Sequence, residues 1–388
     1  MPGAIRMKII RESRIIETPR VAQARGLFDL QAEKSSRVEW NVELPLDEKQ
    51  WQVGLIVGPS GCGKSTLAHE IFGAETIRDF SWPDDQCVLD GFPENFSIKD
   101  LTNLLSRVGF SSPPAWLRPF RALSNGEQFR AKMARALAEA LTNQSPLIVC
   151  DEFTSVVDRT VARIGAHAVA KAAREQGTRF VAVTCHYDVL DWLQPDWVFD
   201  PSTGQFEWRE RKRRPAVEII FQRADSSLWE VFRRHHYLDS ALHRSAKCFA
   251  AYAGFVGEEK RLAAFAAALP FPHPKIKNVW REHRCVCLPD FQGLGIGHAL
   301  SEFVASLFRF VRKNYRSTTS HPAMIAHRRR SPLWKCVRDP AMTTKNKGRA
   351  YKGYRYSSEN RLSAGFEFIG AASSDAIARG FMPEFFRI

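Results

Sequence analysis

Short apolar runs alternate with longer amphipathic stretches through the first half of the chain. The runs have the length and the unbroken apolar character of strands buried on both faces. The predicted strands are residues 54–57, 147–150 and 179–185, and the predicted helices are residues 65–72, 126–141 and 162–175. Strands that alternate with helices predict a mainly parallel sheet covered on both faces, which is an α/β domain.

The second half has a different pattern, with a strand, a helix, a hairpin and a second strand–helix pair. The predicted strands are residues 217–221, 247–255, 261–269 and 285–288, and the predicted helices are residues 227–237 and 298–313. This order is typical of an α+β domain rather than of a second alternating sheet.

The two patterns meet at a charge run closed by a proline, residues 209–215 (RERKRRP). A chain of 388 residues is long enough for two hydrophobic cores. We therefore expect a first domain at 1–208, a basic linker at 209–215 and a second domain at 216–388.

The first predicted strand runs directly into a glycine loop that fits the pattern G-x-x-x-x-G-K-[ST] and precedes a helix. In that context, backbone N–H groups and the helix N-terminus cradle phosphates. Lys64 is expected to reach the β- and γ-phosphates of ATP, and Ser65 to bind Mg²⁺. The expected ATP-binding residues of this loop are Gly58, Pro59, Ser60, Gly61, Cys62, Gly63, Lys64, Ser65 and Thr66.

Two carboxylates, Asp151 and Glu152, follow the apolar strand at 147–150. Acidic groups at the end of a buried strand are costly without a cation or a donor. We therefore expect Asp151 to support Mg²⁺ and Glu152 to polarise the attacking water.

A further segment, Leu123-Ser-Asn-Gly-Glu-Gln128, resembles the signature motif of ABC ATPases, although Asn125 stands in place of a glycine. The resemblance covers about residues 5–205. It implies ATP sandwiched in a nucleotide-dependent homodimer, with Ser124 and Gly126 closing over the partner's nucleotide. It also implies a D-loop at Asp158 and a catalytic switch at His186.

Two features of this resemblance stay open. Gln86 is a candidate for the glutamine that contacts Mg²⁺, and an ordinary loop residue is the alternative. Either Phe28 or Trp40 could stack on adenine.

A second glycine loop follows the strand at 285–288 and precedes the helix at 298–313. The next ~20 residues contain no strand that ends in an Asp or Glu able to hold a ribose, which disfavours a dinucleotide site. The loop resembles the acyl-CoA loop of GNAT acyltransferases, which implies acetyl-CoA or another acyl-CoA as cofactor. The residues expected to bind it are Gln292, Gly293, Leu294, Gly295, Ile296 and Gly297. Candidates for proton transfer stay open among Glu282, Tyr351, Tyr354 and Tyr356.

The net charge of +14 lies entirely in the second half. Residues 1–208 have 23 Lys and Arg against 27 Asp and Glu, whereas residues 209–388 have 33 against 15. The basic segment 309–361 predicts a nucleic-acid partner, although solubility or an acidic protein would also explain it. The predicted contacts are Arg328, Arg329, Arg330, Lys345, Lys347 and Arg349. The basic segment and residues 361–370 resemble phage and mobile-element proteins of the Mom DNA-modification type.

Neither the cysteines nor the hydropathy indicates secretion or a membrane. The eight cysteines form no CxxC pair, and no apolar run approaches the roughly 18 residues of a spanning helix. We expect a cytoplasmic ATPase that couples ATP hydrolysis to acyl-type modification of nucleic acid. The alternatives are the ATP-binding subunit of a transporter and a DNA-binding defence or maintenance ATPase without acyl transfer.

Overall fold

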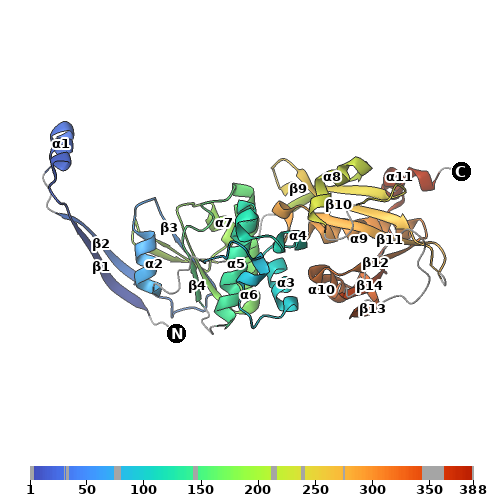
Figure 1. The fold of residues 1–388 in the computed structure, drawn as a ribbon, viewed down its shortest axis with the longest axis horizontal. Helices are drawn as coiled ribbons and strands as arrows, with labels where there is room; N and C mark the ends of the chain where they lie inside the picture. Colours follow the sequence, from blue (N-terminus) through green and yellow to red (C-terminus); the bar gives the residue numbers. More distant parts are fainter. Residues whose placement is uncertain are drawn as a thin grey trace. The chain divides into compact units, whose positions relative to one another are not determined.

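The computed structural model describes residues 4–29, 31, 35–73, 80–142, 147–210, 216–236, 241–273, 276–342 and 362–386. These residues form two compact units (Figure 1). The first unit comprises Met1–Phe80, Asn143–Ser155 and Ala173–Lys212, and the second comprises Ser81–Thr142, Val156–Ala172 and Arg213–Ile388. Residues 81–142 and 156–172 therefore pack with the carboxy-terminal half of the chain.

The first unit contains a five-stranded sheet with the order β4-β5-β3-β6-β7 among the described residues. Its strands are β3 (Val53–Val57), β4 (Leu147–Cys150), β5 (Arg179–Thr184), β6 (Trp197–Asp200) and β7 (Gln205–Trp208). All neighbours are parallel except β6 and β7. Every residue of β3 is buried, as expected for a central strand covered on both faces. The predicted α/β class is confirmed.

A separate antiparallel ribbon joins β1 (Ile5–Arg14) to β2 (Ser35–Leu44) in the first unit. Ile9, Val42 and Leu44 at one end of the ribbon belong to the same core cluster as Ile56 and Val181 of the parallel sheet. Helix α1 (Pro19–Phe28) lies between β1 and β2 in the sequence. Thr18 caps its N-terminus, and the Thr18 side chain accepts a hydrogen bond from Val21 N. Helices α2 (Lys64–Phe72) and α7 (Val189–Leu193) complete this unit.

The second unit contains a seven-stranded sheet with the order β13-β14-β12-β11-β10-β9-β8 in the described part of the chain. Its strands are β8 (Val217–Ala224), β9 (Lys247–Phe255), β10 (Arg261–Pro270), β11 (Val279–Cys287), β12 (Asn314–Thr319), β13 (Trp334–Met342) and β14 (Leu362–Phe368). The predicted hairpin at 247–255 and 261–269 is confirmed. The predicted helix at 227–237 is instead divided into α8 (Trp229–Phe232) and short 3₁₀ turns on either side.

Strands β11 and β12 form the parallel pair of this sheet, and their pairing is short. Register runs from Val279 opposite Asn314 to Arg281 opposite Arg316. Beyond these three pairs, β11 continues to pair with β10 through Cys287, while β12 pairs with β14. The two strands therefore separate toward their carboxyl ends, where the glycine loop follows β11.

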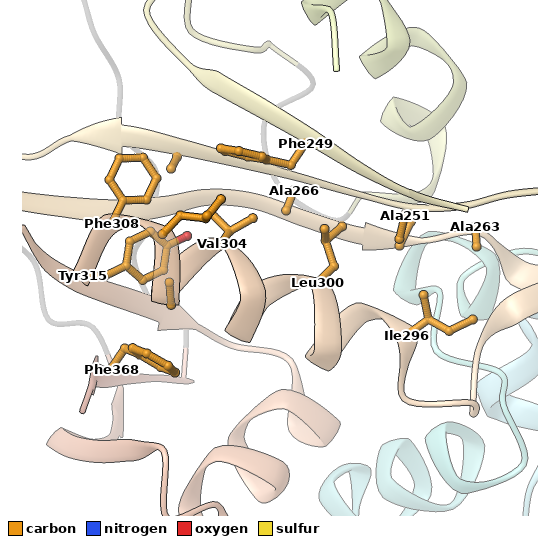
Figure 2. Close-up of a cluster of buried hydrophobic side chains, with 14 of the residues drawn as sticks. Phe249, Ala251, Ala263, Ala266, Ile296, Leu300, Val304, Phe308, Tyr315 and Phe368 are labelled. Atoms are coloured by element: carbon orange, nitrogen blue, oxygen red, sulfur yellow. The ribbon is translucent and has the colours of Figure 1, made fainter. Parts of the chain in front are cut away.

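Helix α9 (Ile296–Phe310) supplies the core of the second unit. Ile296, Leu300, Val304 and Phe308 recur every four residues, so they share one face of the helix. Figure 2 shows these side chains beside Ala251, Ala263 and Ala266 of the sheet. Small residues on β9 and β10 let the helix approach the sheet closely.

The remaining helices of the second unit are α3 (Ile98–Arg107), α4 (Pro113–Trp116), α5 (Asn125–Thr142), α6 (Arg159–Gln176), α10 (Pro322–Arg330) and α11 (Asp375–Phe381). The last residues of α6 belong to the first unit. Ile164 of α6 is buried in the same cluster as Phe255 and Phe291. Arg163 forms an ion pair of 2.6 Å with Glu258 and lies over the Phe255 ring.

Candidate functional site

The first glycine loop has the geometry of a phosphate cradle. Gly61 and Gly63 adopt φ of +81° and +92°, a region that favours glycine, and Gly63 caps the N-terminus of α2. The ammonium of Lys64 donates to the carbonyl oxygens of Gly58 at 3.0 Å and Pro59 at 2.7 Å. Lys64 thus lies along the loop, where a phosphate can replace the carbonyl partners.

Trp40 is the aromatic residue that the structure brings to this loop. Its indole N–H donates to the carbonyl of Cys62 at 3.0 Å. A Cβ added at Gly63 would lie 2.3 Å from the ring, so the indole packs directly on this glycine. Phe28, the other candidate for adenine stacking, is 68% exposed on α1. The geometry favours Trp40 over Phe28.

The predicted catalytic groups lie at the same edge of the sheet as the phosphate loop. Asp151 and Glu152 directly follow β4, His186 follows β5, and the phosphate loop follows β3. Because β3, β4 and β5 are parallel, these three segments lie at the carboxyl ends of the strands. Glu152 is exposed and has φ of +48°, which costs a non-glycine residue about 1–2 kcal/mol. Its N–H donates to Oδ1 of Asp151 at 2.9 Å.

The signature segment and the D-loop residue cap helices in the second unit. Oε2 of Glu127 accepts hydrogen bonds from the N–H and hydroxyl of Ser124 at 2.9 and 3.1 Å, which is a capping box for α5. Oδ1 of Asp158 accepts from Thr160 N and Val161 N at the start of α6. Ser124 and Asp158 are exposed, and so is Gln86. Their approach to a nucleotide, and the role of Gln86 at Mg²⁺, stay predictions.

The second glycine loop also ends in a helix N-terminus. Gly293 and Gly295 have φ of +90° and +80°, and Gly295 caps α9. A Cβ at Gly295 would meet no atom within 4 Å, so this part of the loop faces open space. The backbone is therefore suited to an approaching pyrophosphate at residues 294–298.

Gln292 differs from the other residues of this loop because its side chain points into the protein. Its amide bonds Ser111 N, Ser112 Oγ and the Cys287 carbonyl. The side chain is 6% exposed. All of these bonds go to protein groups, so the side chain holds the loop in place. That Gln292 belongs to an acyl-CoA-binding loop stays a prediction.

A buried ion pair occupies the region where β11 and β12 separate. Arg328 bonds both carboxylate oxygens of Glu282 at 3.0 Å and the hydroxyl of Ser301 at 2.8 Å, and it also bonds Ser317. Arg328 is 1% exposed and lies 4.2 Å from the centre of the Trp334 ring. The prediction that Arg328 contacts nucleic acid is wrong, because its charge is neutralised inside the protein. The same pair leaves Glu282 poorly placed to act as a general base.

Of the other predicted nucleic-acid contacts, two are described by the structure and three are not. Arg329 and Arg330 are exposed at the end of α10. Arg329 forms a surface ion pair of 2.6 Å with Asp339. Lys345, Lys347 and Arg349 lie outside the described residues, as do Tyr351, Tyr354 and Tyr356.

Sequence reasoning missed a histidine pair beside the acyl-CoA loop. The rings of His298 and His327 stack with centroids 3.8 Å apart, and Nε2 of His327 lies 3.0 Å from Oε1 of Glu302. Burial, followed by the nearby charge of His327, lowers the pKa of His298 to about 3. The spacing of four residues between His298 and Glu302 is a signal for a shared helix face, but His327 comes from another helix.

The described residues contain neither a metal cluster nor a membrane span. No group of three or more His, Cys, Asp or Glu side chains among them is arranged to hold a metal ion. Within the same residues, no helix has the length and apolar character needed to cross a bilayer.

Comparisons with known proteins relate this chain to two different families. Residues 186–324 match the acetyltransferase (GNAT) family model, and this match includes the whole second glycine loop. A protein of Methanopyrus kandleri with the provisional name ABC transporter ATP-binding protein MK0182 is 25% identical over 183 residues. That alignment covers 38% of this chain and 66% of the relative, so the chain spans just under two thirds of that protein.

Solved ATP-binding cassettes also align with the chain. MJ0796, in a dimeric post-hydrolysis state bound to ADP and Pi, gives a TM-score of 0.35 at 20% identity over 43% of this chain and 89% of that chain. MJ1267 in its ADP conformation gives 0.32 at 18% identity over 52% and 90%. The family and sequence matches relate the amino-terminal part to ABC ATP-binding proteins and the carboxy-terminal part to GNAT acetyltransferases.

Removing Arg328 should destabilise the second unit strongly. Arg328→Met leaves the Glu282 carboxylate buried without its cation, which should cost about 3–5 kcal/mol. Arg329→Met is the matched control, because that arginine is exposed and should change stability by less than about 1 kcal/mol. Urea denaturation followed by tryptophan fluorescence measures both. Equal effects of the two substitutions would contradict the buried ion pair.

Proposed function

We propose that the chain binds and hydrolyses ATP at the first glycine loop. The observation that carries this proposal is the shared sheet edge of the phosphate loop, Asp151, Glu152 and His186. Mg²⁺ neutralises phosphate charge when bound, and Ser65 and Asp151 are the groups that would hold it. Glu152 would orient the attacking water and accept its proton, and His186 would contact the γ-phosphate.

The second proposed activity is acyl transfer from acetyl-CoA or another acyl-CoA. Three observations support it: the open Gly295, the separation of β11 from β12, and the family match over 186–324. Backbone N–H groups of residues 294–298 would hold the pyrophosphate at the N-terminus of α9. The amine, after losing its proton to a base, attacks the acyl carbon and forms an amide. The C–S bond of the thioester breaks, and CoA leaves as a thiolate that takes up a proton.

The proposed assembly is a homodimer formed on ATP. The exposed Ser124 at the start of α5 is available to a second copy of the chain, and Gly126 follows in the same turn. A phosphate placed there would meet the positive end of the helix dipole. The chain is proposed to act in the cytoplasm.

The proposed acceptor of the acyl group is nucleic acid, and the supporting observation is the charge of residues 209–388. Their 33 Lys and Arg against 15 Asp and Glu make a polyanion the favoured partner. Arg329 and Arg330 are the exposed cations of the predicted set within the described residues. A resemblance to Mom-type proteins of phages and mobile elements agrees with this acceptor.

Two other functions make different predictions. A transporter ATP-binding subunit, suggested by the name of the Methanopyrus relative, would co-purify with a membrane protein. A defence or maintenance ATPase would bind DNA but not acyl-CoA. Neither accounts for the glycine loop before α9, which is why acyl transfer is preferred.

Glu152→Gln should abolish steady-state ATP hydrolysis while leaving ATP binding within about twofold. The substitution keeps the shape and the strained backbone of residue 152 and removes the charge that orients water. Phosphate release and equilibrium ATP binding measure the two effects. Glu207→Gln, an exposed glutamate on β7, is the control. Normal turnover in Glu152→Gln would refute the assignment.

Gly295→Glu should eliminate acetyl-CoA binding because it places a carboxylate where the pyrophosphate must approach. Gly257→Glu is a matched control, since Gly257 has a similar φ of +83° and no atom within 4 Å of an added Cβ. The two variants carry the same backbone strain and the same added charge. Calorimetry on the full chain should show binding by the control alone. If the unsubstituted chain binds no acetyl-CoA, acyl transfer is the wrong function.

Arg329→Ala with Arg330→Ala should weaken the salt dependence of duplex DNA or tRNA binding. Each lost phosphate contact reduces the slope of log affinity against log salt by about 0.9, so two contacts give a change of about 2. Arg379→Ala is the control. Arg379 is an exposed arginine of α11, and like Arg329 it forms a surface ion pair, with Asp375 of the same helix. Parallel slopes for the double variant and the unsubstituted chain on both polymers would reject this nucleic-acid face.

A further inference from the structure

The acyl-CoA loop is fastened to residues 109–112, which follow α3 in the same compact unit. Oε1 of Gln292 accepts a hydrogen bond from Ser111 N at 2.6 Å. Its Nε2 donates to Ser112 Oγ at 2.9 Å and to the Cys287 carbonyl at 3.0 Å. A buried amide with three partners resists displacement, because each broken bond would leave a polar group unsatisfied.

The two backbones also approach closely at this contact. Gly109 has φ of +81°, and a Cβ there would lie 2.9 Å from the carbonyl oxygen of Gln292. A Cβ at Gly293 would lie 3.3 Å from Cα of Gly109. By contrast, the space around Gly295 is open. The loop is therefore held against residues 109–112 on one side and accessible to a ligand on the other.

Arg130 of α5 forms a second link to the same region. It is 1% exposed, and its Nε, Nη1 and Nη2 atoms have no hydrogen-bond partner among the described residues. Nη1 lies 3.7 Å from a Cβ built on Gly126, and Cδ lies 3.8 Å from one built on Gly109. The side chain thus fills the space between the first turn of α5 and residue 109.

Within the described part of the chain, no group forms a hydrogen bond to the Arg130 guanidinium. Burial lowers the pKa of Arg130. The negative charge of Asp290, two residues before Gln292, is the largest effect that opposes this lowering. A buried cation without a hydrogen-bonded anion is costly by several kcal/mol. An anion arriving at the first turn of α5 would reduce this cost.

We propose that residues 109–112 and Arg130 couple the signature segment to the acyl-CoA loop, so that ATP and acyl-CoA bind with positive cooperativity. This inference rests on the proposed function, in which Ser124 and Gly126 contact the partner's ATP. A phosphate at Gly126 fixes Arg130, which packs against residue 109, and residue 109 packs against the loop. This chain of contacts would then favour the loop conformation that binds acyl-CoA, which is a coupling free energy between the two sites.

The test is calorimetry of acetyl-CoA binding to the full chain with and without AMP-PNP and Mg²⁺. AMP-PNP should tighten acetyl-CoA binding at least about fivefold, the lower end of typical coupling between sites. By linkage, acetyl-CoA must tighten AMP-PNP binding by the same factor. The reciprocal titration provides an independent measurement of that factor.

Substitutions at the contact should reduce the coupling factor. Ser112→Ala removes one of the three hydrogen bonds that hold Gln292 and should lower the factor. Gln292→Ala removes all three bonds and should bring the factor close to one. Ser111→Ala is the matched control, because Ser111 donates through its backbone N–H, which the substitution retains.

The possible outcomes separate this inference from the function on which it rests. Equal acetyl-CoA affinity with and without AMP-PNP in the unsubstituted chain would overturn the coupling while leaving both ligand sites in place. An unchanged factor in Ser112→Ala and Gln292→Ala would overturn the role of residues 109–112. Absence of acetyl-CoA or AMP-PNP binding in every state would refute the proposed function itself and the coupling with it.

Discussion

Both candidate sites depend on one constraint, which is that a phosphate must meet unpaired backbone N–H groups at the start of a helix. A side chain at the wrong position of such a loop would obstruct the anion or force the backbone out of the left-handed region. The chain satisfies this constraint twice, at Gly61 and Gly63 before α2 and at Gly293 and Gly295 before α9. In each case a strand of the central sheet fixes one end of the loop, and an apolar helix face fixes the other.

The elements around these loops could be predicted because their signals are local. Apolar runs and the glycine–lysine pattern predicted β3, α2, β4 and β5 to within a few residues, and the second loop was predicted to lie between a strand and α9. The hairpin of β9 and β10 was equally clear. These features depend on residues that are neighbours in sequence, and the physical chemistry of each segment is nearly sufficient to determine it.

The sequence could not show the direction of side chains whose surroundings come from distant parts of the chain. A run of three arginines, residues 328–330, looks uniform in sequence, but α10 turns Arg328 inward to Glu282 of β11 and leaves Arg329 and Arg330 in solvent. Gln292 fits its motif, yet Ser111 and Ser112, about 180 residues earlier, determine where its amide points. No periodicity within one helix or loop contains this information.

Residues 81–142 and 156–172 pack with the carboxy-terminal half. This packing limits how the two halves could be separated by recombination between genes. If the acyltransferase-like half were transferred to another gene by a break near residue 212, it would lose the protein groups that now bond Gln292 and cover Phe291 and Phe255. The exchanged segment would expose apolar surface and an unsatisfied amide. A substitution in one half therefore changes which substitutions the other half tolerates. Positions near Ser112 and Ile164 should covary with positions in the glycine loop.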